Sequence, residues 1–244
     1  MSLFDSYFLC TSPRSGSTFL CTLLEDCGAG HPASYFHRPS LTGWRSELGL
    51  CEETPREDIF ATARKRGMGR HPISGVRLQR PSLGFFRHQL AQVHPEHPND
   101  LSRITYIFGR TAFIHLTRTD KLDQAVSLIR AQQSGLWHRN ADGSELERTG
   151  PAKAAEYDAE AIQAQQTVLR RMDQDWEDWF ARQGISPLRV TYAALSTDPQ
   201  AVLQRLLSEL GLPTEPANSI SARTAKLADH VNADWVARFR AKSP

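Results

Sequence analysis

One stretch near the N-terminus constrains the fold more than any other: Tyr7-Phe-Leu-Cys-Thr-Ser-Pro-Arg-Ser-Gly-Ser-Thr-Phe-Leu-Cys21. Tyr7–Thr11 is nearly continuous in apolar and β-prone residues, which is typical of a buried strand. Ser17–Cys27 has apolar residues at helical spacing, so it predicts a helix that ends near Gly28. A strand that passes through a Ser/Gly/Arg loop into a helix is typical of an anion site, most often for phosphate.

Strands and helices alternate along the rest of the chain. The predicted later strands are Ile73–Leu78, Ala112–Thr117 and Leu188–Tyr192. The predicted helices are Leu122–Gln133 after Asp120, Ala152–Arg182 before Gly184, Pro199–Leu210, and the tail from Ala222 to Arg240. Gly30–Pro55 is expected to be a long functional loop with short helical pieces, and Asn140–Pro151 a polar loop.

This alternation predicts an α/β fold with three layers, in which helices flank a mostly parallel central sheet. A length of 244 residues suits one domain, which we expect to span 1–244. Ligands of such sheets bind outside the carboxyl ends of the strands. The loops that follow Thr11 and Thr117 are therefore expected at the same edge of the sheet.

Composition limits the function classes. A net charge of +2 gives no general indication of nucleic-acid binding. The four cysteines form no CxxC pair, which favours a reducing compartment, and Cys10 and Cys21 read as small core residues. The N-terminus does not resemble a signal peptide and no apolar run approaches the roughly 20 residues of a membrane span. We therefore expect a cytoplasmic protein.

Two features allow more than one interpretation. The stretch 56–110 holds ten Arg or Lys against four Asp or Glu, and it is either a solvated, partly helical surface or a rim that attracts an anionic substrate. Four aromatic residues are candidates for stacking on a sugar or aromatic acceptor, with core packing as the alternative for each: Tyr35, Phe36, Trp44 and Trp137.

The loop after the first strand has the residue types that a phosphate site needs. Gly16 permits close approach and an unusual backbone conformation, and Arg14 adds a guanidinium that fits two oxygens at once. Ser15, Ser17 and Thr18 add hydroxyl groups and amides. The loop lacks the first Gly and the Lys of G-x-x-x-x-G-K-[ST], so a nucleoside triphosphatase or small-molecule kinase fits poorly.

A second anion site is predicted at the end of the strand Ala112–Thr117. Arg118 follows this strand and Ser127 lies about two turns into the next helix, so the two are candidates to hold one phosphate. The alternative is a surface Arg and an ordinary helix Ser. Two anion-binding turns on one sheet edge suit a nucleotide with phosphates at both ends of its ribose.

At this point the chain resembles a family. Arg14-Ser-Gly-Ser-Thr18 resembles the 5′-phosphosulfate loop of sulfotransferases that use 3′-phosphoadenosine-5′-phosphosulfate (PAPS), and Arg118 with Ser127 resembles their 3′-phosphate site. The closest resemblance is to the bacterial trehalose 2-sulfotransferase family. It extends to Gln124–Ser127 with Arg130-Ala131, and to Trp137, Trp176–Phe180, Gly184–Pro187 and Asp234–Arg240, and is weakest over 38–110.

The resemblance implies a P-loop-NTPase-like sulfotransferase architecture, PAPS as co-substrate, no metal, a carbohydrate or other small-molecule acceptor, and a homodimer. Arg77, where the family carries a Lys, is expected to neutralise the sulfuryl oxygens, and Lys226 to join the 3′-phosphate site. The alternative function is a PAPS-binding or phosphate-binding protein of this fold without catalytic activity.

The general base is where the chain departs from the family. The family carries Gly-Glu-Pro-x-Glu before two aromatics and its second Glu is the proposed base, whereas this chain reads Gly30-His-Pro-Ala-Ser-Tyr-Phe-His37. Ser34, at that position, is too weak a base. His37 is the first candidate because imidazole suits general-base work, with His31 second and Glu47 as another alternative. Ser34 would then orient the base or the acceptor.

Overall fold

The computed structural model describes residues 2–139, 142, 144–220 and 230–242. Its main sheet has four parallel strands in the order β2-β1-β3-β6, namely β1 (Ser6–Thr11), β2 (Ser74–Gln79), β3 (Thr111–Thr117) and β6 (Leu188–Thr191). β1 lies in the middle, where Thr11 is paired with Gln79 on one side and Leu116 on the other. The four predicted strands and the parallel α/β fold are therefore confirmed.

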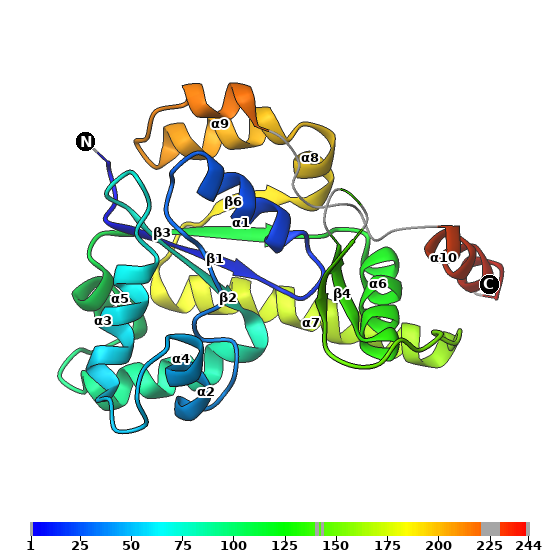
Figure 1. Ribbon diagram of the computed structural model, residues 1–244, viewed down its shortest axis with the longest axis horizontal. Helices are drawn as coiled ribbons and strands as arrows, with labels where there is room; N and C mark the ends of the chain where they lie inside the picture. The colour runs from blue at the N-terminus through cyan, green and yellow to red at the C-terminus, as the bar shows by residue number, and fades with distance from the viewer. Residues whose placement is uncertain (1, 140–141, 143, 221–229, 243–244) are drawn as a thin grey trace.

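One face of the sheet is covered by α1 (Ser17–Asp26), α8 (Tyr192–Thr197) and α9 (Pro199–Glu209), as Figure 1 shows above the strands. A short 3₁₀ helix, η1 (Glu215–Ser219), packs against α9. The apolar stripes of α1 and α9 meet the strands in one buried cluster, which includes Leu20, Leu24, Leu203 and Leu206. This layer fixes the N-terminus of α1 against the sheet edge.

The other face is covered by α2 (Leu41–Glu47), α3 (Arg56–Arg66), α4 (Arg80–Val93), α5 (Asp100–Phe108) and α7 (Ala159–Gln183). Their core is largely aromatic, with Phe8, Phe86 and Trp176 among its buried side chains. α3, α4 and α5 lie in the basic stretch 56–110, for which the two expected alternatives are a solvated, partly helical surface and a rim that attracts an anionic substrate. α3 is rich in charged residues, and its buried side chains are Ile59, Phe60 and Ala63. These three anchor it to the aromatic core.

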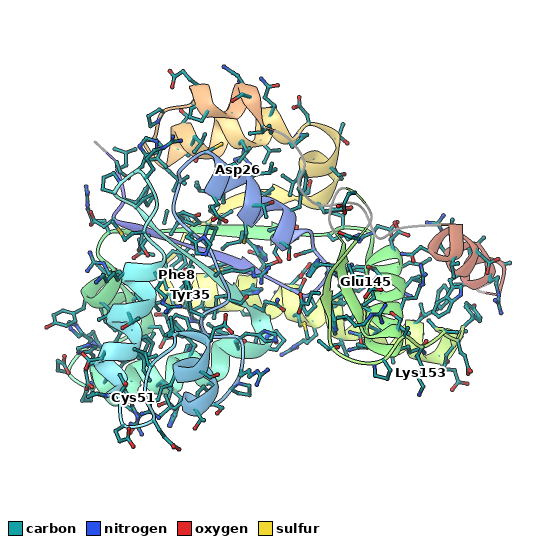
Figure 2. All side chains as sticks on the ribbon, in the orientation of Figure 1. Phe8, Asp26, Tyr35, Cys51, Glu145 and Lys153 are labelled. Carbon is teal, nitrogen blue, oxygen red and sulfur yellow. The ribbon has the colours of Figure 1, made fainter. Side chains whose placement is uncertain are left out.

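Tyr35, Phe36 and Trp44 belong to this aromatic core, which rules out the stacking role considered for them. Each is at most 4% exposed. The Phe36 ring lies 4.8 Å from that of Trp44 and 4.9 Å from that of Phe86. Figure 2 shows Tyr35 beside Phe8 inside this layer. Of the four candidate aromatics, Trp137 alone remains near the site described below.

A third group of elements lies at the end to which the strands point, on the right in Figure 1. It consists of α6 (Lys121–Ser134), an antiparallel hairpin of β4 (Leu136–Arg139) and β5 (Glu145–Arg148), and α10 (His230–Lys242). α6 packs on α7 and α10 around buried Val126, Leu169 and Trp235. Asp120 caps α6 as predicted, because its carboxylate accepts from the amide of Asp123 at 2.9 Å.

The hairpin and the start of α7 differ from expectation. Glu145–Arg148 is a strand inside the segment predicted as a polar loop, held by the Thr149 amide donating to the Gly135 carbonyl at 2.8 Å. α7 begins at Ala159 instead of Ala152, since Asp158 caps it by accepting from the amide of Ala161 at 3.0 Å. The tail is helical from His230, and the expected residues 222–229 lie outside the described part of the chain.

Among the described helices, none combines the length and apolar character needed to cross a membrane. The helices pack around the sheet or against α6 and α7, and we still expect one domain over 1–244.

Candidate active site

A cavity of about 880 Å³ opens at the carboxyl ends of the strands. The loop after β1, the end of β2, the residue after β3 and the first residue after β6 all contribute to its wall: Arg14, Arg77, Arg118 and Tyr192. α6, α7 and the hairpin contribute Ser127, Val168, Met172, Trp137 and His138. Val168 and Met172 of α7 therefore line the cavity.

The loop after β1 has the backbone geometry of an anion site. Gly16 is the N-cap of α1 with φ +90°, and having no side chain it leaves the first amides of the helix for a ligand. A Cβ there would lie 2.5 Å from Cδ2 of Tyr192, so the packing also requires glycine. Arg14 has φ +61°, a left-handed conformation that costs about 1–2 kcal/mol for a residue with a Cβ.

The serine and threonine side chains of this loop are not equivalent. Ser15 is fully buried, its hydroxyl is hydrogen-bonded to that of Thr11, and it is not among the described residues that line the cavity, so the predicted Ser15 hydroxyl is not presented to a ligand. Ser17 and Thr18 both line the cavity. Trp176 of α7 fixes the start of the loop by donating its indole N–H to the Thr11 carbonyl at 3.1 Å.

The two predicted anion sites meet at Arg14. Its Nε donates to Ser127 Oγ at 3.1 Å and its guanidinium also donates to the Trp137 carbonyl at 2.5 Å. Arg118 donates to the Arg14 carbonyl at 3.4 Å and lies 4.6 Å over the Tyr192 ring. Burial, followed by the nearby charge of Arg118, lowers the pKa of Arg14 to about 10. An anion bound here would relieve this repulsion between cations.

A second cluster lies at the β2 side of the cavity. Arg77 donates from Nε to Ser34 Oγ at 2.6 Å and from its guanidinium to Thr18 Oγ1 at 2.8 Å. Thr18 Oγ1 lies 3.2 Å from Nε2 of His138, which comes from β4. Burial, then the charges of Arg14 and Arg77, lower the pKa of His138 to about 4. We refer to Ser34, Arg77, Thr18 and His138 as the Arg77 cluster.

His138 is not among the site residues predicted from the sequence. It lies between the second half of α6 and a segment predicted as loop, and no local pattern singles it out. Only the hairpin, whose Trp137 indole N–H donates to Thr149 Oγ1 at 3.0 Å, turns this residue back over α1.

The candidate bases occupy different places. His37 and Glu47 both line the cavity and have exposed side chains. His31 is not among the described residues that line it, because its Nδ1 lies 2.8 Å from a carboxylate oxygen of Glu25 on α1. The structure thus gives no support to the second-choice base. Lys226, the proposed helper at the 3′-phosphate, lies outside the described residues.

Most of the basic residues of the stretch 56–110 lie away from the cavity. Arg87 pairs with Asp100, and Arg110 pairs with Asp5 at 3.1 Å. Among the described residues, Arg77 is the basic side chain of this stretch that lines the cavity, together with uncharged Gln79 and Pro81. Among all the residues that the structure describes, one group of metal-binding side chains lies close enough to share an ion: His94, Glu96 and His97. None of the three lines the cavity.

These features define a class of protein, namely an α/β protein with a parallel sheet. At the carboxyl edge of the sheet, a strand–loop–helix turn with the geometry of an anion site and the pair Arg118 and Ser127 share one cavity. Comparison with known proteins narrows the class. The chain belongs to the Stf0 sulphotransferase family, whose model matches residues 6–242. The resemblance found in the sequence is thereby confirmed.

Individual relatives cover nearly the whole chain. A trehalose 2-sulfotransferase of Mycobacterium tuberculosis is 27% identical over 98% of this chain and 95% of its own length. The protein of the same name from Mycolicibacterium smegmatis is 28% identical over 96% of this chain and 94% of its own. A crystal structure of a sulfotransferase from Alicyclobacillus acidocaldarius has a TM-score of 0.45 at 13% identity, covering 96% of this chain and 94% of that one.

Proposed function

We propose that this sulfotransferase moves the sulfuryl group of PAPS to a hydroxyl of a carbohydrate or another small metabolite. The observation that carries the proposal is that two groups of basic and hydroxyl side chains line one cavity. One is Arg14 with Arg118 and Ser127, and the other is the Arg77 cluster. A donor with phosphates on both sides of a ribose needs two separate sets of anion-binding groups. Membership of a sulfotransferase family selects this donor over other nucleotides.

The 5′ end of the donor fits the loop after β1. The amides at the start of α1, together with Ser17 and Thr18, would hold the 5′-phosphate, which is the leaving group. Arg77 would neutralise charge on the sulfuryl oxygens, because its guanidinium already contacts Thr18 Oγ1.

The 3′-phosphate fits the pair Arg118 and Ser127, with Arg14 beside them. Arg14 therefore spans both ends of the proposed donor site, since its backbone belongs to the 5′ loop and its guanidinium contacts Ser127. Asp123 orients Arg118, because its carboxylate accepts a hydrogen bond from the Arg118 guanidinium at 3.1 Å.

Two relatives carry the name trehalose 2-sulfotransferase, which makes trehalose the first acceptor to assay. Trp137, His37, Glu47 and Met172 line the cavity and would face the acceptor. A homodimer and a cytoplasmic location remain expectations from the sequence.

A thermal-shift experiment separates this function from nucleotide kinases. Adenosine 3′,5′-bisphosphate without magnesium is expected to stabilise the protein, by about 2.7 kcal/mol at 100 times its Kd, because it binds only the folded state. ADP is expected to stabilise much less. Stronger stabilisation by magnesium–ADP would reject the sulfotransferase proposal. Stabilisation by the bisphosphate with no transfer of labelled sulfate to any acceptor would favour a binding protein without activity.

Arg118→Ala tests the 3′-phosphate site. The variant is expected to lose roughly ten- to a hundredfold of the preference for PAPS over its 3′-dephospho analogue, because one charge-assisted hydrogen bond contributes about 1.5–3 kcal/mol. The ratio of kcat/KM for the two donors is the measurement. An unchanged ratio would mean that another part of the chain holds this phosphate.

A further inference from the structure

His138 lies where a proton acceptor would be needed. Its Nε2 is 3.2 Å from Thr18 Oγ1, and Thr18 contacts the guanidinium of Arg77 at 2.8 Å. It therefore belongs to the part of the cavity proposed to hold the sulfuryl group. We infer that His138 is the general base that takes the proton of the acceptor hydroxyl, an assignment that rests on the proposed function.

The hydrogen bonds of the Arg77 cluster accommodate a neutral His138 with an unprotonated Nε2. A guanidinium only donates, so Thr18 Oγ1 accepts from Arg77 and keeps its own proton to donate. In the tautomer that carries the ring proton on Nδ1, His138 accepts from Thr18 at Nε2, 3.2 Å away. A general base needs this lone pair, so this tautomer is the one assigned to His138, and the acceptor hydroxyl replaces Thr18 as the donor to Nε2.

A carboxylate lies close enough to His138 to stabilise its protonated form. Glu147 of β5 has an oxygen 3.6 Å from the same Nε2, and it too lines the cavity. An opposite charge at this distance favours the imidazolium that forms when the proton arrives. Glu147 is a positioning and charge-stabilising residue in this arrangement, and the hairpin brings both side chains together.

The charges around His138 make its basicity depend on the donor. Burial and two positive charges, Arg14 from the loop after β1 and Arg77 from β2, lower the pKa of His138 to about 4. The carboxylate of Glu147 from β5 acts in the opposite direction and favours protonation of His138. An anionic nucleotide on Arg14 and Arg77 offsets their charge. The pKa of His138 is then expected to rise, so the base strengthens when the donor site is filled.

The step balances with one proton transfer. The acceptor oxygen forms a bond to sulfur while the bond between sulfur and the 5′-phosphate oxygen breaks, and adenosine 3′,5′-bisphosphate leaves with that electron pair. The acceptor proton moves to Nε2 of His138, beside Glu147. His37 lines the same cavity, but its exposed side chain has none of the contacts that link His138 to Thr18 and Glu147.

Histidine NMR titration tests the charge coupling without any acceptor. Between pH 5 and 8, His138 of the free protein is expected to stay neutral. With saturating adenosine 3′,5′-bisphosphate its ring signals are expected to titrate, because an opposite charge nearby raises a histidine pKa by roughly 1–3 units. His138→Gln assigns the signals. A His138 that stays neutral over this range in the complex overturns the inference, since so weak a base gains nothing from the donor.

Kinetics with the acceptor supply the second test. His138→Gln keeps an acceptor for the Thr18 hydroxyl but cannot take a proton, so kcat is expected to fall roughly 10²–10⁴-fold, while affinity for the bisphosphate at pH 8 changes less than about threefold. His88→Gln, on an exposed position of α4, is the control. Near-normal kcat in His138→Gln, with the large loss in His37→Gln instead, overturns the assignment and leaves the sulfotransferase function intact. Failure of the unaltered protein to transfer sulfate overturns the function itself.

Discussion

Arg14→Ala is expected to lower kcat/KM with PAPS by roughly 10²–10⁴-fold. The guanidinium of Arg14 lies between the two proposed phosphate sites, in contact with Ser127 and near Arg118. The loss corresponds to two charge-assisted hydrogen bonds at about 1.5–3 kcal/mol each. The fold is expected to tolerate the change, because it removes a cation whose pKa burial and Arg118 already lower.

The measurement pairs steady-state kinetics with urea unfolding. Arg171→Ala is the matched control, since that arginine is 73% exposed on α7 and pairs with Asp175 at 2.8 Å. It should leave kcat/KM unchanged. If Arg14→Ala retains near-normal kcat/KM, Arg14 has no part in the mechanism. If its free energy of unfolding falls as steeply as its activity, the loss is structural.

Gly16→Ala is expected to lose both stability and donor binding. The backbone at φ +90° costs a residue with a Cβ about 1–2 kcal/mol. The new Cβ would also lie 2.5 Å from Tyr192 Cδ2, so the ring or the loop must move. Because the first amides of α1 shift with the loop, affinity for adenosine 3′,5′-bisphosphate should fall more than about tenfold.

Gly84→Ala provides the opposite case. Gly84 lies inside α4, and a Cβ there would meet nothing within 4 Å. This variant is expected to gain about 0.5–1 kcal/mol of unfolding free energy, with unchanged affinity for the bisphosphate. Urea unfolding and calorimetric titration of both variants make the comparison. Equal stability and equal affinity in the two variants would contradict the geometry proposed for the loop.

Much of the fold could be predicted because its signals are local. β1, the loop with Arg14 and Gly16, and α1 are consecutive, so their pattern of apolar, small and polar residues is enough to define them. The same holds for β3 with Arg118 and α6 with Ser127. Parallel strands then bring both loops to one edge, which is why Arg14, Arg118 and Ser127 line one cavity in the structure.

Other features had a weaker local signal or one that was not used. α3 presents few apolar residues at regular spacing, and a shared aromatic core that depends on distant strands fixes it. α4 and α5 do carry apolar residues at helical spacing, a signal that the predicted elements did not include. The burial of Trp44 and Phe36 likewise follows from which helix lies next to which. Figure 2 places Cys51 at the far end of this layer, and it is exposed where the three other cysteines are buried.

The sequence by itself determined the sheet, the loop between β1 and α1 and the family, because each depends on patterns of residues that are neighbours in the chain. The tertiary structure alone decided which groups face the reacting end of the cavity. Ser15 turned its hydroxyl to Thr11, His31 paired with Glu25, and His138 entered the site. The physical reason is that side-chain direction, burial and neighbouring charge depend on packing in three dimensions. That packing selects among possible local partners, as for Ser15 and His31, and joins segments 120 residues apart, as for Thr18 and His138.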